Sequence, residues 1–202
     1  MAQEADRAFA VLKSGGVAIM PMDVGYSAIG GSYAALRRIF DAKRRQPTKF
    51  NAMIGDNELA RELYVHPDEG WAAFDAITVD DDLPLGVIGP CRMDHPILAT
   101  MEPDALSMST KDGTLCMLTK AGPFHAAISR RSREAGHALF GSSANLSLAG
   151  TKFQAVDIEP EIRDVADIVI DHGLQKCWPY RATSTLLDLS TFEVVPMALV
   201  LN

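Results

Sequence analysis

Short apolar runs alternate along the chain with segments whose apolar residues recur at helical spacing. Residues 3–14 place Leu12 and several alanines on one face and stop at Gly15, which predicts a helix. Ser32 is a favourable N-cap for a second helix, and Pro47 lies at its expected end. The same reasoning predicts further helices at 58–65, 123–135 and 158–165, and strands at 17–20, 52–54, 114–119, 138–140, 166–170, 183–189 and 192–200.

Two stretches fit neither pattern. Residues 23–31 are rich in glycine and polar residues and are predicted to form a loop. Residues 66–112 contain Pro, Gly and Asp so often that no element is predicted there. The mixed order of helices and strands nevertheless predicts an α/β (α+β) domain around one mixed sheet. Because no linker, repeat or low-complexity tract divides residues 1–202, we expect a single domain.

Charge and cysteine content narrow the functional classes. The formal net charge is -7, so the chain lacks the overall positive field that attracts nucleic acid without specificity, and a phosphate site must be a local cluster of cations. The three cysteines and five histidines do not have metal-ligand spacing, so neither a disulfide framework nor a zinc site is predicted. The first residues do not resemble a signal peptide and no apolar run reaches transmembrane length, which predicts a cytoplasmic protein without membrane contact.

One segment of this acidic chain carries a dense cluster of cations. Lys43, Arg44, Arg45 and Lys49 lie within seven positions at the end of the second predicted helix. Lys43 falls on the apolar face of that helix, so we expect its ammonium group to point toward the interior or a cavity. Such a cluster suits phosphates and carboxylates, but it also suits a helix C-terminus, where cations offset the macrodipole. Composition alone favours the second interpretation.

Three further segments could carry chemistry, although each also has a structural interpretation. Residues 141–147 read Gly-Ser-Ser-Ala-Asn-Leu-Ser, which offers hydrogen-bond donors to an oxyanion but is also typical of a turn. Residues 184–188, Ser-Thr-Leu-Leu-Asp, fit a strand with polar ends. Residues 21–26, Pro-Met-Asp-Val-Gly-Tyr, fit a structural loop at the end of a strand.

Taken in this order, the four segments resemble the YrdC-like threonylcarbamoyl-AMP synthase family. The family motif P-T-D-T-x-Y-G-L is similar to residues 21–28, and its helix ending in K-x-R and then K-P is similar to residues 43–50. Its T-S-A-N-x-S-G is similar to residues 142–148, and its S-T-V-V-D to residues 184–188. The resemblance extends over roughly residues 8–200 and is to the short, single-domain form of the family.

The resemblance implies a fold and an activity. The expected fold is a twisted mixed sheet flanked by helices, with a basic concave pocket. The expected activity is that of a nucleotidyltransferase, which makes threonylcarbamoyl-AMP and pyrophosphate from L-threonine, bicarbonate and ATP with Mg²⁺. The product would serve the t6A modification of a tRNA adenosine, and RNA binding, to tRNA or double-stranded RNA, is also implied.

The resemblance also assigns roles to individual residues. Lys43 and Arg45 are expected to be catalytic, and with Lys49 to hold carboxylate and phosphate charges. Ser143 and Asn145 are expected to hydrogen-bond the nucleotide or substrate, Ser184 to line the same pocket, and Tyr26 to close over the amino-acid end. On this basis Lys43→Ala or Arg45→Ala should weaken ligand binding with little loss of folding stability.

Several positions depart from the family pattern. Met22 and Val24 replace the two threonines of the opening motif, and Leu118 stands where an arginine is expected unless Lys120 substitutes for it. Each loss could remove a hydrogen bond to ATP or threonine, on the order of 1.5 to 3 kcal/mol for a charge-assisted bond. Three hypotheses therefore stay open: the synthase, a paralogue that binds AMP, ATP or RNA without full catalysis, and a carbamoyl-adenylate enzyme that uses another amine or acceptor.

Overall fold

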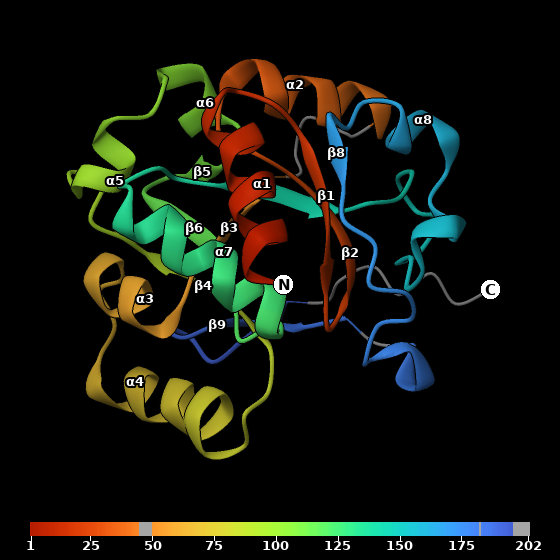
Figure 1. Ribbon diagram of the computed structural model, residues 1–202. Coiled ribbons are helices and arrows are strands. Elements are labelled where there is room, and N and C mark those ends of the chain that lie inside the picture. Colours follow the sequence, from red (N-terminus) through yellow and green to blue (C-terminus); the bar gives the residue numbers. More distant parts are fainter. Residues whose placement is uncertain (45–49, 182, 196–202) are drawn as a thin grey trace.

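Strands from both ends of the chain join one mixed sheet. The computed structural model describes residues 1–44, 50–181 and 183–195 (Figure 1). Within these residues the strand order is β10-β9-β4-β6-β3-β7-β2-β1-β8, and β5 pairs with β6. The strands are β1 (Ala18–Met22), β2 (Gly25–Gly30), β3 (Ala52–Ile54), β4 (Leu85–Pro90), β5 (Thr110–Lys111), β6 (Thr114–Thr119), β7 (Phe140–Ser143), β8 (Ile168–Val169), β9 (Thr185–Asp188) and β10 (Val194–Val195).

Helices cover the sheet from both sides. α2 begins after Ser32, whose hydroxyl accepts a hydrogen bond from the Ala35 amide at 3.2 Å, as predicted for an N-cap. The α-helices are α1 (Ala2–Lys13), α2 (Tyr33–Ala42), α3 (Asn57–Leu63), α4 (Asp68–Asp75), α5 (Pro96–Ala99), α6 (Pro103–Ser107), α7 (Pro123–Glu134) and α8 (Pro160–Arg163); a π-helical turn η1 (Ala76–Asp80) and 3₁₀ turns η2 (Ala155–Asp157) and η3 (Trp178–Tyr180) complete them. None of these helices is both long enough and apolar enough to cross a membrane.

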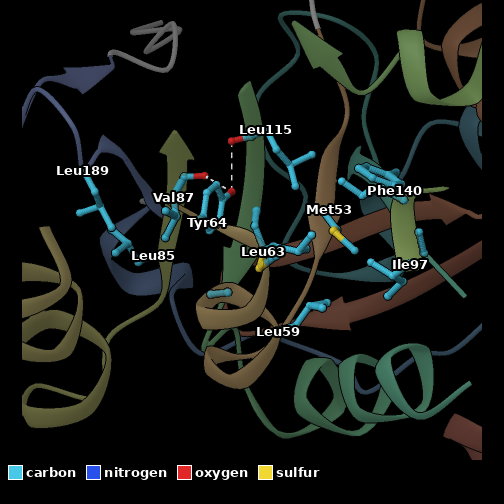
Figure 2. Close-up of a cluster of buried hydrophobic side chains, with 14 of the residues drawn as sticks. Met53, Leu59, Leu63, Tyr64, Leu85, Val87, Ile97, Leu115, Phe140 and Leu189 are labelled. Atoms are coloured by element: carbon cyan, nitrogen blue, oxygen red, sulfur yellow. Dashed lines mark hydrogen bonds between the residues drawn. The ribbon is translucent and has the colours of Figure 1, made fainter. Parts of the chain in front are cut away.

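One face of the sheet packs against most of the helices. Met53, Val87 and Leu115 point to this side and form a core with α3–α6, in which the Tyr64 hydroxyl lies 3.0 Å from the Val87 carbonyl oxygen and 3.1 Å from that of Leu115 (Figure 2). Along β1 and β2 the same side packs against α2 and α8. In the first of these cores, the hydrogen-bonded hydroxyl allows the bulky Tyr64 side chain to be buried without an unpaired polar group.

The opposite face is covered only in part. α1 and α7 lie side by side on it (Figure 1) and bury Met20, Met22 and Ile54. Strand pairing places a second group of side chains on this face, beyond that cluster. These side chains belong to none of the three hydrophobic clusters, and all of them except Ser27 are only partly buried. We call this area the open face; it carries Ser27, Ala52, Ile88, Cys116, Ser143 and Leu186.

Most predicted elements are confirmed, and the main errors concern the middle and the glycine-rich stretches. Residues 23–31 were predicted to form a loop, but Gly25–Gly30 is a strand, buried along its whole length between β1 and β7. Small residues suit this position: a β-carbon on Gly141, opposite Ile29, would lie 2.0 Å from the Ala28 carbonyl oxygen. Residues 66–112, left without elements, contain α4, η1, β4, α5, α6 and β5. The strand predicted at 138–140 instead occupies Phe140–Ser143.

Candidate functional site

The end of α2 and the end of β7 meet at the edge of the open face. Lys43 follows the last turn of α2 and is only 4% exposed. Its ammonium group donates to the carbonyl oxygen of Asn145 at 2.6 Å and to that of Ser143. The Lys43 carbonyl in turn accepts from the Ser147 amide at 3.2 Å. The prediction that Lys43 points inward is confirmed, and two predicted segments a hundred residues apart in sequence lie together.

These contacts give Lys43 a structural task. A buried cation is tolerated where its donors are satisfied, and here two backbone carbonyl dipoles face it. Removing the ammonium group would leave both carbonyls without this partner. The expectation that Lys43→Ala leaves stability almost unchanged therefore does not fit the structure. Lys43 fixes the backbone on which Ser143 and Asn145 are carried.

Asn145 offers an acceptor within this turn. Its side chain is 6% exposed, and its amide nitrogen donates to the Leu146 carbonyl oxygen at 2.5 Å. Its Oδ1 atom is buried and has no hydrogen-bond partner among the described residues. Because buried polar atoms are nearly always hydrogen-bonded, this oxygen is suited to receive a donor from a bound molecule.

An ion pair that the sequence did not predict, between Glu159 and Lys152, contacts the backbone next to the 143–145 turn. Glu159, the N-cap residue of α8, accepts from the Leu146 amide at 3.3 Å and pairs with Lys152 at 2.8 Å. Burial raises the pKa of Glu159, but the hydrogen bonds from Lys152 and the backbone outweigh it and the net pKa is lowered. The carboxylate therefore stays charged and holds the turn. Its only sequence signal is a glutamate before proline at a helix start.

Ser143 and Ser184 project toward the same side of the sheet. Ser143 pairs with Ser27 on the open face. Ser184 precedes β9, and its alternation with Leu186 places it on the same side. Three strands, β3, β6 and β4, lie between β7 and β9, which is a separation of roughly 19 Å at about 4.8 Å per strand in a flat sheet. A shared pocket for these two serines stays a prediction.

Tyr26 lies on the other side of the sheet. Its ring is fully buried with α2 and α8, and its hydroxyl is 2.8 Å from Asp171 Oδ1 and 2.9 Å from the Gly173 carbonyl oxygen. The hydroxyl also accepts from the His172 amide at 3.0 Å. Burial and the neighbouring carboxylate raise the pKa of Tyr26 to about 12, so it stays protonated. In the structure the Tyr26 hydroxyl holds the 171–173 turn by hydrogen bonds. Its predicted role in closing over the amino-acid end of the substrate site stays a prediction.

The opening motif is apolar where the family pattern has hydroxyls. Met22 and Val24 are buried in the cluster that contains Phe124 of α7. Beside them is a pocket of about 100 Å³, smaller than the roughly 300–1,000 Å³ that small-molecule sites occupy. Its lining includes Met22, Asp23, Phe124, His172 and Gln175. This pocket has room for a small group but not for a whole nucleotide.

Other predicted cations are placed differently or not described. Arg45 and Lys49 lie outside the described residues, so their predicted roles stay predictions. Lys120, the possible substitute for the missing arginine, pairs with Asp82 at 2.5 Å beyond the end of β6. Within the described part of the chain, no group of three or more His, Cys, Asp or Glu is arranged to hold a metal ion.

Comparison with known proteins decides the family. The model of the Sua5, YciO and YrdC proteins, described as "Telomere recombination", matches residues 10–197. The chain belongs to this family. No curated protein sequence matches it. Membership confirms the resemblance found in the motifs, and the mixed sheet flanked by helices is the fold of the solved structures described next.

Three solved structures illustrate the likeness. A hypothetical protein, smu.1377c from Streptococcus mutans UA159, is 22% identical with a TM-score of 0.70, covering 95% of this chain and 78% of that one. E. coli YciO is 17% identical with a TM-score of 0.67, covering 99% and 93%. P. abyssi Sua5 complexed with L-threonine is 18% identical with a TM-score of 0.70, and the match covers 93% of this chain but 51% of Sua5. At these identities the likeness shows the fold alone.

Proposed function

We propose that this Sua5/YciO/YrdC-family chain is a nucleotidyltransferase that makes a carbamoyl-adenylate, with L-threonine as the first candidate amine. The observation that carries the proposal is the 143–145 turn, which Lys43 anchors at the edge of the open face and in which Asn145 presents a buried acceptor. The L-threonine complex of P. abyssi Sua5, a structural neighbour, supports threonine as the first amine to test.

The proposed chemistry asks for positioning and charge stabilisation. The threonine amine and bicarbonate form a carbamate with loss of water, and the carbamate oxygen attacks the α-phosphorus of ATP as the bond to pyrophosphate breaks. Such transfers need no protein nucleophile, and Mg²⁺ arrives with ATP as part of the substrate. In this proposal the Ser143 hydroxyl orients the phosphates, while Arg45 and Lys49 offset their charge. Lys43 acts by holding the turn.

A second candidate is a nucleotide-binding paralogue without turnover. Met22 and Val24 are packed into a hydrophobic cluster with α7, so this part of the chain offers no hydroxyl to an amino acid. Leu118, on the same side of the sheet, also packs against that cluster. This candidate keeps the 143–145 turn and with it ATP or AMP binding, but loses the amine site.

Pyrophosphate release separates these candidates. The chain is incubated with ATP, Mg²⁺ and bicarbonate, with and without L-threonine, and ATP affinity is measured in parallel by calorimetry. Threonine-dependent release supports the synthase, and release that requires another amine supports the reaction class with a different substrate. ATP binding without release for any amine overturns the enzyme and supports the paralogue. Absence of ATP or AMP binding overturns both.

Asn145→Ala tests the residue assignment in the same assays. Loss of one hydrogen bond to the ligand should weaken ATP binding by roughly 3- to 10-fold. Ser190→Ala, in the exposed turn after β9, is the control and should bind ATP as the unmodified chain does. Equal ATP affinity in the Asn145 variant and the control would contradict the assignment of the turn.

A further inference from the structure

A small pocket lies where the β1–β2 turn meets the start of α7. Its volume is about 100 Å³, and its apolar lining includes Pro21, Met22, Ala121, Pro123 and Phe124. We call it the Met22 pocket. An apolar cavity of about 150 Å³ can hold benzene, so this smaller volume suits a group of roughly four carbon atoms. The pocket is therefore the size of a short side chain.

The chemistry of the lining is mainly apolar. Among the described residues that line the pocket, none is Ser, Thr or Tyr. The polar side chains of this lining already have partners within the protein, in the pairs Asp23–Lys176 (3.6 Å), His172–Glu4 (3.2 Å) and Gln175–Tyr26 (3.2 Å). A ligand hydroxyl placed here would lose its hydrogen bonds to water and gain little in return.

The pocket lies on the same side of the sheet as the 143–145 turn. Met20 pairs with Ser27, which pairs in turn with Ser143. Met22 is two residues further along β1 than Met20, so its side chain faces the same side. In a flat sheet the Cα atoms of Met22 and Ser143 would lie roughly 12 Å apart. Both side chains project from this side, which shortens the gap that a ligand must bridge.

We propose that the Met22 pocket receives the side chain of the amine substrate and selects a short apolar one, as in L-valine, over that of L-threonine. The inference rests on the proposed function and narrows its amine. Met22 and Phe124 contact the apolar group, while the 143–145 turn holds the phosphate end. The valine amine and bicarbonate form a carbamate with loss of water, and the carbamate oxygen displaces pyrophosphate from the α-phosphorus of ATP.

L-Valine is the sharpest comparison because it has the shape of L-threonine, with a methyl group in place of the hydroxyl. The methyl group gains free energy on entering an apolar lining, whereas a hydroxyl without a partner loses it. An apolar pocket discriminates against such a hydroxyl by about 100-fold. Because polar groups border part of the Met22 pocket, we expect kcat/KM for L-valine to exceed that for L-threonine by roughly 10- to 100-fold.

The first experiment measures pyrophosphate release from ATP, Mg²⁺ and bicarbonate while each amine is varied separately. Glycine has no side chain to fill the pocket, and the side chain of L-phenylalanine is too large for a volume of about 100 Å³. We expect L-valine to give the highest kcat/KM, with L-threonine, glycine and L-phenylalanine all lower. This order tests both the polarity and the size of the pocket.

Two methionine variants tie the preference to the pocket. Met22→Thr places a hydroxyl in the lining and should shift the ratio of valine to threonine kcat/KM toward threonine by roughly 3- to 10-fold. Met20→Thr is the control, because Met20 is buried in the same hydrophobic cluster but does not line the pocket. A ratio measured on one preparation is unaffected by any loss of folded protein.

Methyl NMR provides a readout that needs no turnover and no destabilising substitution. The nine methionines are labelled with ¹³C at the methyl group, and the spectra of Met22→Leu and Met53→Leu identify two of the signals. Amines are titrated in the presence of α,β-methylene-ATP, which cannot release pyrophosphate. We expect L-valine to shift the Met22 signal at a concentration roughly 10-fold or more below that required for L-threonine. The Met53 signal, from the core on the other side of the sheet, should not move.

The outcomes separate this inference from the proposed function. Pyrophosphate release with L-threonine equal to or better than L-valine would overturn the inference and leave the enzyme standing. An equal shift of the ratio in Met22→Thr and Met20→Thr, or an unmoved Met22 signal, would also overturn the inference. A valine-selective shift of the Met22 signal without release for any amine would support the pocket and overturn the enzyme.

Discussion

Single side chains in this protein serve the candidate site mainly through the backbone. Lys43 was expected to touch a ligand, but its ammonium group binds the carbonyl oxygens of Ser143 and Asn145. The helical spacing predicted its inward direction, because Leu36 and Ile39 lie on the same face. Its acceptors could not be predicted, because they lie about a hundred residues further along the chain and meet it only through the β7–β2 pairing.

Lys43→Met should lower the free energy of unfolding by about 2–4 kcal/mol. The methionine fills most of the volume but removes the charged donor from two carbonyls. The loss costs about 1–3 kcal/mol at the buried Asn145 carbonyl and about 1 kcal/mol at the Ser143 carbonyl, which still accepts from the Asn145 amide. Urea denaturation measures the change, and Lys13→Met in the exposed last turn of α1 is the control, expected within about 0.5 kcal/mol of the unmodified chain. A Lys43 variant as stable as the control would contradict the anchoring role.

His125 gives the fold a pH dependence. It is buried in α7, its Nε2 lies 3.0 Å from the Leu118 carbonyl oxygen, and burial lowers its pKa to about 4 from an ordinary 6.5. Above pH 6.5 both folded and unfolded chains keep it neutral, and its full stabilisation is present. As the pH falls toward 4 the unfolded chain takes up the proton first, so stability falls by on the order of 3 kcal/mol.

The comparison variant is His125→Gln, which keeps a donor for the Leu118 carbonyl but does not titrate. Thermal unfolding between pH 7 and pH 4 should show a steeper loss of stability in the unmodified chain than in the variant. Parallel curves for the two proteins over this range would show that His125 is not the titrating group.

At the scale of elements, the sequence predicted helices better than strands. α1, α2 and α7 have a cap, a glycine stop or an N-terminal proline together with an apolar face, and each was placed within a few residues. β2 was missed because a strand buried on both faces and built mostly of small residues has no alternation to detect. This error also hid the orientation of Tyr26, since side chains on β2 alternate between the open face and the opposite side.

The α2 cap has a consequence for the site. Ser32→Ala removes the hydrogen bond to the Ala35 amide and should cost about 1 kcal/mol of folding stability. Because α2 carries Lys43 to the 143–145 turn, ATP affinity should fall only slightly while the fold remains intact. Chemical denaturation and calorimetry measure the two effects, and no change in unfolding free energy would contradict the capping role.

For the whole molecule, the family and the mixed sheet were predictable, but the arrangement of the site was not. Four weak motifs in order identified the family, and the match over residues 10–197 confirms it. Ser143 and Ser184 face the same side of the sheet, and β3, β6 and β4 lie between the β-strands near which these serines are found. This strand order depends on long-range pairing that no local pattern reveals. The cytoplasmic location, the tRNA partner and the roles of Arg45 and Lys49 stay predictions.

The central claim is that a nucleotide binds at the 143–145 turn, at the edge of the open face, and Cys116 lies on that face between Ala52 and Ile88. In a Cys91→Ser, Cys177→Ser variant, the rate at which a thiol reagent modifies Cys116 is measured with and without ATP, Mg²⁺ and bicarbonate. A Cys116→Ser, Cys177→Ser variant, which keeps Cys91 beside the opposite core, is the control. The account predicts that saturating ATP slows the modification of Cys116 several-fold and leaves the rate of modification of Cys91 unchanged. An unchanged rate at Cys116 with ATP bound would contradict the account.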